Sequence, residues 1–306
     1  MKFTFLIVSL FLLVSSANAF KLITQKVTDN VYALVGEIGP RTQENLGLNN
    51  TVGFIITSDG VVLVGSGPSE EAAKLIEASI KDVTDKPIKL VMNIASQDHH
   101  WMGNTYFLSQ KIPVKALKST VETQKKNLDG HIARLEGALK TTLNKDTFKH
   151  ASDIIESDKN VFKLGETDFE ISYLGDAHFP GDAVLWLPKQ KVIFTADMVY
   201  HDRMLGIQPY SKAKPWLATF EKMISFKPES IIPGHGYAGN IAKAEKDTGN
   251  YLKWLISEVS KAKEDWEDLG DMVKRLSETS QFDHLKFHET WNPVNLNRTY
   301  LQLEAE

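Results

Sequence analysis

No cysteine occurs among the 306 residues of this chain. Disulfide bonds are therefore excluded, and packing alone has to stabilise the fold. Thiolate is also excluded as a metal ligand. A metal site in this chain would use histidine, carboxylate or amide oxygen, a set that suits zinc or a harder divalent cation without choosing between them.

The sequence also lacks an excess of positive charge. It holds 35 Lys and Arg against 39 Asp and Glu, which gives a formal net charge of −4 with neutral histidines. This balance gives no electrostatic reason to bind nucleic acid or an anionic membrane. We therefore expect neither as a partner, and the oligomeric state stays open.

Long apolar runs are absent except for Phe3 to Leu13, which follows Met1-Lys2 and precedes the small residues Ala17-Asn18-Ala19. This order is typical of a secretory signal peptide. The alternative is a membrane anchor, but a spanning helix needs about 20 apolar residues. We predict a signal peptide at residues 1–19, no stable membrane insertion after its cleavage, and an exported protein, periplasmic or secreted.

Residues 20–306 are expected to form a single domain in which strands alternate with helices. Apolar runs bounded by turn residues predict strands, at residues 31–35, 53–57, 61–64, 88–92, 169–173, 183–187, 191–195 and 230–232. Periodic segments predict helices, at 69–81, 119–143, 216–226, 242–265 and 264–278, and residues 295–304 are read as an extended closing segment. One sheet from each half, packed face to face and covered by helices, would bury both sheets.

A group of histidines follows the predicted strand at residues 88–92. The segment reads Asn93-Ile-Ala-Ser-Gln-Asp-His-His-Trp-Met-Gly-Asn104. It resembles the second motif of the metallo-β-lactamase superfamily, Asn-Thr-His-x-His-x-Asp-His-x-Gly-Gly-Asn. With both asparagines aligned, the two first histidines of the motif fall on Ala95 and Gln97, its aspartate on His99 and its third histidine on His100. The alternative register pairs Asp98-His99 with the motif's Asp-His but displaces both asparagines.

Three more segments carry the resemblance, so that it covers residues 30–240. They are Gly175 to Asp182 with His178, the pair Ala196-Asp197 after a strand, and Ile231 to Gly236 with His235. The resemblance implies an αββα four-layer sandwich of two mixed β-sheets, with the segment 241–306 adding C-terminal helices and the closing segment. Each motif alone is weak, and their order and strand contexts carry the argument.

The resemblance also implies two metal sites, and this chain has fewer ligand residues for the first than for the second. The first would have Ala95, Gln97 and His178, where alanine donates nothing and Gln97 is at best a weak ligand. The second would have His99, His100, Asp197 and His235, a plausible zinc set. We expect one zinc ion or another divalent cation, with His178 close enough to join it or to contact substrate.

Other residues differ from the motifs or have simpler roles. The strand that ends Val64-Gly65-Ser66-Gly67 lacks the aspartate with which the family braces its metal loop, so we expect that brace to be absent, and Met102 replaces a motif glycine. Asp98 is expected to point away from the metal, and Asp182 to tie down the Pro180-Gly181 turn. His178 and His235 could also be ordinary buried histidines.

Two classes of function fit these residues. The first is a metal-dependent hydrolase acting on a small-molecule ester, lactone, amide or phosphoester, with Asp197 and His178 as catalytic residues. The second is a non-catalytic binding protein of the same fold, with a structural metal or none. His99 in place of a carboxylate bears on the choice, because an imidazole orients an attacking water less well.

Overall fold

The computed structural model describes residues 20–304 of the chain. The predicted signal peptide lies outside these residues and stays a prediction. Among residues 20–304, no helix is both long and apolar enough to span a bilayer.

The first half of the chain forms a seven-stranded mixed sheet. Its strands lie side by side in sequence order, antiparallel from β1 to β4 and parallel from β4 to β7. They are β1 (Ile23–Lys26), β2 (Val31–Val35), β3 (Thr51–Thr57), β4 (Gly60–Val64), β5 (Ile88–Asn93), β6 (Val114–Leu117) and β7 (Asp153–Ile155). The parallel part places the carboxyl ends of β4 and β5 at one edge, where the histidine segment begins.

The second half forms a five-stranded sheet in the order β12-β11-β10-β9-β8. All neighbours are antiparallel except β11 and β12, which are parallel. The strands are β8 (Lys159–Leu164), β9 (Thr167–Tyr173), β10 (Ala183–Leu187), β11 (Val192–Tyr200) and β12 (Ser230–His235). The predicted strands are thus confirmed, and β1, β6, β7 and β8 were not anticipated.

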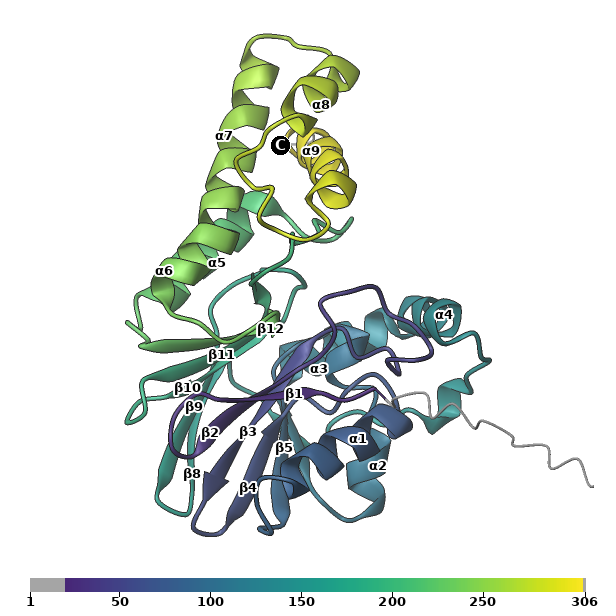
Figure 1. Ribbon diagram of the computed structural model, residues 1–306, viewed down its shortest axis with the longest axis vertical. Helices are drawn as coiled ribbons and strands as arrows, with labels where there is room; N and C mark the ends of the chain where they lie inside the picture. The colour runs from purple at the N-terminus through teal and green to yellow at the C-terminus, as the bar shows by residue number, and fades with distance from the viewer. Residues whose placement is uncertain (1–19, 305–306) are drawn as a thin grey trace, which may run out of the picture.

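The two sheets pack face to face with helices on both outer faces (Figure 1). Buried side chains of both sheets, such as Ile55 and Leu185, meet in one apolar cluster between them. The helices of the first half are α1 (Glu70–Lys81), α2 (Asn104–Ser109), α3 (Lys118–Lys126) and α4 (Leu128–Leu139), and α5 (Ala213–Ile224) covers the second sheet. The predicted αββα four-layer sandwich is therefore confirmed.

Helix α1 shows how local sequence sets these layers. The Ser69 side chain accepts a hydrogen bond from the Ala72 N–H and caps the helix, and Glu70 and Glu71 suit its positive amino terminus. Ala72, Ala73, Ile76 and Ile80 recur at helical spacing and are buried against the first sheet. Polar residues occupy the opposite face, so the helix has one way to pack.

Helices at the carboxyl end extend beyond the sandwich (Figure 1). They are α6 (Ile241–Ala244), a π-helical turn at Glu245–Gly249, α7 (Asn250–Glu264), α8 (Leu269–Ser277) and α9 (His288–Glu304). The expected extended segment at 295–304 is wrong, because these residues belong to α9. The alternating Leu-x-Leu pattern near the end favoured a strand, whereas the buried face of α9 is largely polar and includes Asn292, Asn295 and Thr299.

Candidate metal centre and its pocket

Asp197 lies in the middle of strand β11, and its position depends on an irregularity in that strand. The pairing of β11 with β12 shifts register between Phe194 and Ala196, and Ala196 has a φ of 44°. Such a bulge re-aims the following side chain. The expectation that Asp197 closes a strand ending at Thr195 is wrong, since the strand continues through the bulge to Tyr200.

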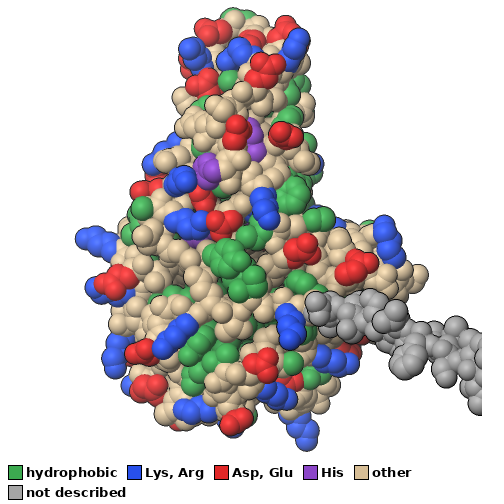
Figure 2. Space-filling model, in the orientation of Figure 1, with side chains coloured by type: hydrophobic (Ala, Val, Ile, Leu, Met, Phe, Trp, Pro, Cys, Tyr) green, Lys and Arg blue, Asp and Glu red, His purple; other side chains and the backbone are tan. Residues whose placement is uncertain are grey.

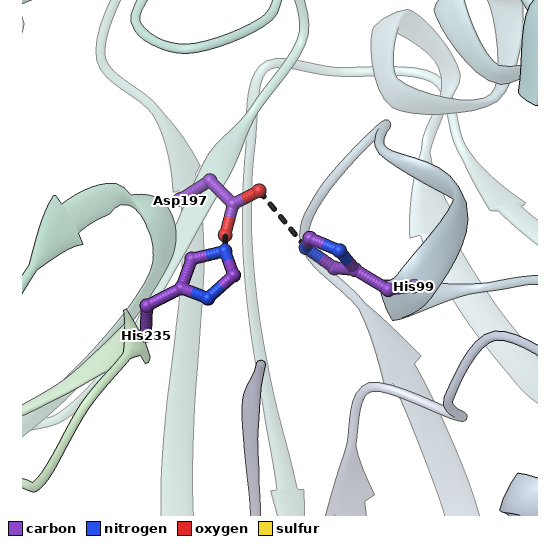
Figure 3. Close-up of side chains that lie close together, drawn as sticks. All are labelled: His99, Asp197 and His235. Carbon is purple, nitrogen blue, oxygen red and sulfur yellow. Dashed lines mark hydrogen bonds and ion pairs between the residues drawn. The ribbon is translucent and has the colours of Figure 1, made fainter. Parts of the chain in front are cut away.

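Imidazole groups from three other parts of the chain surround the Asp197 carboxylate. His99 and His100, on a short 3-10 turn after β5, each place Nε2 3.0 Å from one carboxylate oxygen. His235 ends β12, and its Nε2 lies 3.4 Å from Asp197 Oδ1. His178, from the loop between β9 and β10, places Nε2 3.9 Å from Oδ2. The side chains of His99, Asp197 and His235 converge as a potential cation site (Figure 3).

The second ring nitrogens of these histidines have different partners, which fix where the protons lie. Nδ1 of His235 is 2.7 Å from the Asn49 carbonyl oxygen, so Nδ1 carries the proton and Nε2 offers a lone pair. Nδ1 of His99 instead faces the Arg41 guanidinium. Because arginine can only donate, Nδ1 of His99 accepts and its Nε2–H donates to Asp197.

Burial and charge together set the protonation of the centre. Burial lowers the pKa of His99 to about 3 and that of His178 to about 4. Burial also lowers the pKa of His235 well below its usual value. For Asp197, burial favours the neutral acid, but the surrounding imidazoles hold its pKa well below the usual range. At neutral pH the centre thus holds a buried carboxylate together with the neutral imidazoles of His99, His178 and His235.

Gln97 and His178 lie together where the first metal site would be. The Gln97 amide end is 2.7 Å from His178 Nε2. Hydrogen bonding favours the orientation in which the amide nitrogen also donates to Asp197 Oδ2 at 2.7 Å. The amide oxygen then accepts from Arg134 Nη1 at 3.0 Å and from Arg41 Nη2 at 3.1 Å. Ala95 is fully buried in the apolar cluster between the sheets.

Two other carboxylates near the centre have structural partners. Asp98 forms a bidentate ion pair with Arg41, with 2.9 Å between Nη2 and Oδ1. That ion pair holds the Asp98 pKa below its usual range even though burial favours the neutral acid. Asp182 accepts from the N–H groups of Phe179 and Ser96, so it ties the 180–181 turn to the histidine segment.

The segment 64–67 has no aspartate to brace the metal loop, as expected, but Ser66 supplies other hydrogen bonds to it. The Ser66 N–H donates to the His100 carbonyl at 2.8 Å, and the Ser66 hydroxyl donates to Asn104 at 2.8 Å. Asn104 in turn donates to Asn93 at 2.7 Å. A neutral network of Ser66 and the two motif asparagines therefore holds the loop without an aspartate.

Above the centre lies a pocket of about 190 Å³. Gln97, His99, His178 and His235 line it, and Tyr200 stacks on His235 at 4.6 Å between ring centroids. Trp101 is fully buried and bonds to Ser96, so it belongs to the packing. His131, His150, His201, His284 and His288 are outside this lining.

Three arginines in the pocket wall were missed by sequence reasoning. Arg41 comes from the loop after β2, Arg134 from α4 and Arg203 from the loop after β11. None of them stands in a motif, and no periodic pattern marks them. Arg41 lies in the polar loop between β2 and β3, but nothing in the sequence of that loop distinguishes this residue.

Comparisons with known proteins identify related sequences and folds. The sequence model of the Metallo-beta-lactamase superfamily matches residues 46–235. A metallo-beta-lactamase type 2 from Elizabethkingia meningoseptica is 29% identical over 142 residues, which cover 46% of this chain and 48% of that protein. A linear primary-alkylsulfatase from a Pseudomonas strain is 22% identical over 218 residues, covering 60% of this chain and 40% of that protein.

A solved structure extends the likeness of fold toward the carboxyl end. The sec-alkylsulfatase of a Pseudomonas species superposes with a TM-score of 0.69 at 16% identity, covering 92% of this chain and 50% of that protein. A share this large has to reach into the helices that begin at residue 241. The matched regions nevertheless span only about half the length of these relatives.

Proposed function

The chain belongs to the metallo-β-lactamase superfamily, and from that premise we propose that it is a metal-dependent hydrolase of small molecules that binds one divalent cation, with zinc the expected ion. The observation that carries the proposal is the convergence of His99, His100 and His235 on the buried Asp197. Asp197 stands within strand β11, His235 ends β12, and His99 and His100 lie on the braced loop. Fixed donors of this kind are what a catalytic metal needs.

The donor set fits one cation better than two. His235 offers a free Nε2 lone pair, and burial keeps the His99 and His235 imidazoles beside the Asp197 carboxylate neutral. A divalent cation at this point would balance the buried negative charge. The first site offers only Gln97 and His178, because Ala95 has no donor atom. We therefore assign the metal to His99, His100, Asp197 and His235.

Each group in the pocket has a role that follows from its position. A bound divalent cation supplies water that ionises near neutral pH and polarises the oxygen under attack. Asp197 would accept a hydrogen bond from the attacking water and thereby orient it. His178 faces the same space from the loop between β9 and β10 of the same sheet. It would donate to the oxygen that gains negative charge if its Nε2 carried the ring proton and released the Gln97 amide.

The substrate belongs to a broad class of hydrolysable bonds. The relatives include a β-lactamase and an alkylsulfatase, and their names support amides and sulfate esters as candidates beside esters, lactones and phosphoesters. A β-lactam as such is less well supported, because this chain lacks the cysteine and the first-site histidines of the well-known enzymes.

Elemental analysis of the purified chain tests the proposal. We expect a metal-to-protein ratio near one, which falls toward zero in Asp197→Asn and in His235→Ala. His284→Ala is the matched control, because His284 pairs with Asp247 outside the centre and should leave the ratio unchanged. A metal-to-protein ratio near zero in metal-replete wild type would refute the proposed hydrolase. A ratio near two would show that the first site also binds a metal ion.

A binding protein without turnover is the second candidate, and one observation favours it. Arg41 holds His99 in the tautomer whose Nε2 carries a proton, which opposes metal binding through that atom. Screening the metal-replete chain against ester, lactone, amide, phosphoester and sulfate-ester substrates separates the two candidates. Turnover that disappears in Asp197→Asn would establish the enzyme.

We also propose export of the mature chain. Support comes only from the pattern of Met1-Lys2, the apolar run and Ala17-Asn18-Ala19. Sequencing the amino terminus of the protein recovered from its native cell should give Phe20 as the first residue. An intact Met1 in the mature protein would overturn this proposal.

A further inference from the structure

The pocket beside the proposed metal centre carries more positive than negative charge. Three guanidinium groups, from Arg41, Arg134 and Arg203, line it. Asp98 pairs with Arg41, and the Asp197 carboxylate faces imidazoles and the Gln97 amide. The three arginines and these two carboxylates together have a net charge of +1. A divalent cation at Asp197 would raise this net charge to +3.

Two of the three arginines have no carboxylate partner. Within residues 20–304, no carboxylate oxygen lies within 4.0 Å of Arg134 or Arg203. Arg134 contacts neutral groups, the Tyr210 hydroxyl at 3.3 Å and the Gln97 amide oxygen at 3.0 Å. Arg203 donates to the Gly39 carbonyl at 3.3 Å and lies over the Phe287 ring.

Arg203 is the clearest sign of a missing anion. The residue is only 8% exposed, and within the described chain its Nε has no hydrogen-bond partner. A buried guanidinium normally has its donors satisfied, since leaving one unpaired costs free energy. A buried guanidinium that lines a pocket, has an unpaired Nε and contacts only neutral groups indicates a ligand of opposite charge.

Two of the arginines, Arg41 and Arg134, lie on the side of the centre that lost its metal ligands. Gln97 stands at one of the lost positions, and its amide connects Asp197 and His178 on one end to Arg134 and Arg41 on the other. A metal at the first site would have supplied positive charge here. Guanidinium groups supply it instead, with hydrogen-bond donors arranged in a planar fork that suits oxyanions.

We propose that Arg134 and Arg203 form an oxyanion-binding subsite, and that the substrate of this protein carries a sulfate, phosphate or carboxylate group held there beside the single-metal centre. This substrate class rests on the proposed function, but the subsite is a property of the chain without its metal. Arg41 contributes charge to the subsite while its fork remains on Asp98.

The size of the pocket limits which part of the substrate it can enclose. A volume of about 190 Å³ is smaller than the roughly 300–1,000 Å³ of sites that enclose a whole drug-sized ligand. It can hold an anionic head group with a few waters, each of which takes about 30 Å³. The remainder of a larger substrate would extend out of the pocket.

Calorimetric titration of simple anions tests this inference. Inorganic sulfate, inorganic phosphate and acetate are each titrated at low ionic strength into the full chain, once treated with a chelator and once loaded with zinc. We expect wild type to bind at least one of them without metal. Arg134→Met and Arg203→Met should each weaken binding by about 10- to 100-fold, the effect of losing a hydrogen bond to a charged group.

Two further variants keep the result interpretable. Arg275→Met is the matched control, because Arg275 pairs with Glu267 on the exposed side of the C-terminal helices and should leave binding unchanged. If Arg203→Met fails to fold, Arg203→Lys keeps the charge without the fork and should bind more weakly than wild type. The order of affinity among the three anions identifies the head group.

The outcomes separate this inference from the proposed hydrolase. Equal anion affinity in wild type and in the pocket variants would overturn the subsite, as would the absence of binding by all three anions. A metal ratio near one with turnover of uncharged esters would then leave the hydrolase standing. Anion binding that depends on Arg134 and Arg203 in a chain that takes up no metal would support the subsite and refute the hydrolase.

Discussion

The Arg41 guanidinium donates to Nδ1 of His99, while Nε2 of the same ring contacts Asp197 at 3.0 Å. A metal-binding histidine normally donates its distant N–H to an acceptor, which leaves the lone pair of the other nitrogen for the metal. Arg41 imposes the opposite arrangement and adds a positive charge. Metal uptake therefore requires Arg41 to release the ring.

Metal affinity should rise when residue 41 accepts a hydrogen bond from His99 Nδ1 and no longer donates one to it. In the double variant Arg41→Gln with Asp98→Asn, the glutamine oxygen can accept the Nδ1–H, and no buried carboxylate loses its partner. We expect zinc affinity to increase by about 10-fold, at the lower end of effects from groups that orient metal ligands. Competition with a chromophoric chelator measures it, with Asp98→Asn alone as the control. Unchanged or weaker affinity would contradict this tautomer assignment.

Gly234 should be essential because no side chain fits beside Asp197. A Cβ at this position would meet the Asp197 carboxylate and the backbone of Ala196. Gly234→Ala should cost about 1–3 kcal/mol in the free energy of unfolding, as overpacking does, and should lower the metal ratio. Gly137→Ala in α4 meets open space and should stabilise by up to about 1 kcal/mol. Denaturant unfolding compares the two, and equal effects would refute the steric argument.

Asn295 of α9 should position the loop that carries part of the pocket wall. Its amide donates to the Leu205 carbonyl at 2.8 Å and accepts from the Ile207 N–H at 2.7 Å. Asn295→Leu leaves both backbone groups buried and unpaired, so we expect a loss of about 1–3 kcal/mol and weaker anion binding. Asn250→Leu changes an exposed position and is the control. Normal anion affinity in a destabilised Asn295→Leu would limit its role to stability.

Acid should destabilise the metal-free protein partly through His131. Burial lowers the His131 pKa to about 4 from the usual 6.5, so the folded form excludes a proton that the unfolded chain takes up. Stability gained from this residue is present above pH 6.5 and is lost as pH falls toward 4, by at most about 1.4 kcal/mol per pH unit. His131→Phe, which suits the neighbouring Trp101 and Phe179 rings, should flatten that dependence.

Unfolding free energies measured from pH 7 to pH 4, in steps, with chelator present, check this effect. Gln281→Phe changes an exposed residue that does not titrate and should leave the slope close to that of wild type. A His131→Phe protein with the wild-type slope would show that the acid sensitivity arises elsewhere.

The sheets could be predicted because their signals are local. Strands such as β3, β4 and β10 are continuous apolar runs between turn residues. Glycine and proline also lie near His178 in its loop and near His235 at the end of β12. The buried face of α9 could not be predicted in this way, because Asn292, Asn295 and Thr299 gain their partners only from distant segments. A polar residue in the sequence does not reveal that such a partner exists.

In the candidate site, too, residues with a local sequence signal could be predicted, and residues that only tertiary contacts bring together could not. The residues around Asp197 occupy motif positions and follow strands, so the resemblance located them. Arg41, Arg134 and Arg203 reach the pocket from a loop, a helix and another loop, and only the tertiary fold brings them together. The bulge at Ala196 was also hidden, since alanine rarely adopts a positive φ and gives no warning of it.

The pocket wall joins Arg41 near the beginning of the chain to Trp291 on its last helix. All the proposed metal ligands have been synthesised once translation reaches residue 235. The pocket wall is complete only after α9 has also been synthesised and has packed against the rest of the protein. During translation the centre would therefore exist for a time as an open surface that excludes water poorly. The finished pocket is a late event in biogenesis, and a prematurely terminated chain could retain its metal ligands without acquiring selectivity for substrate.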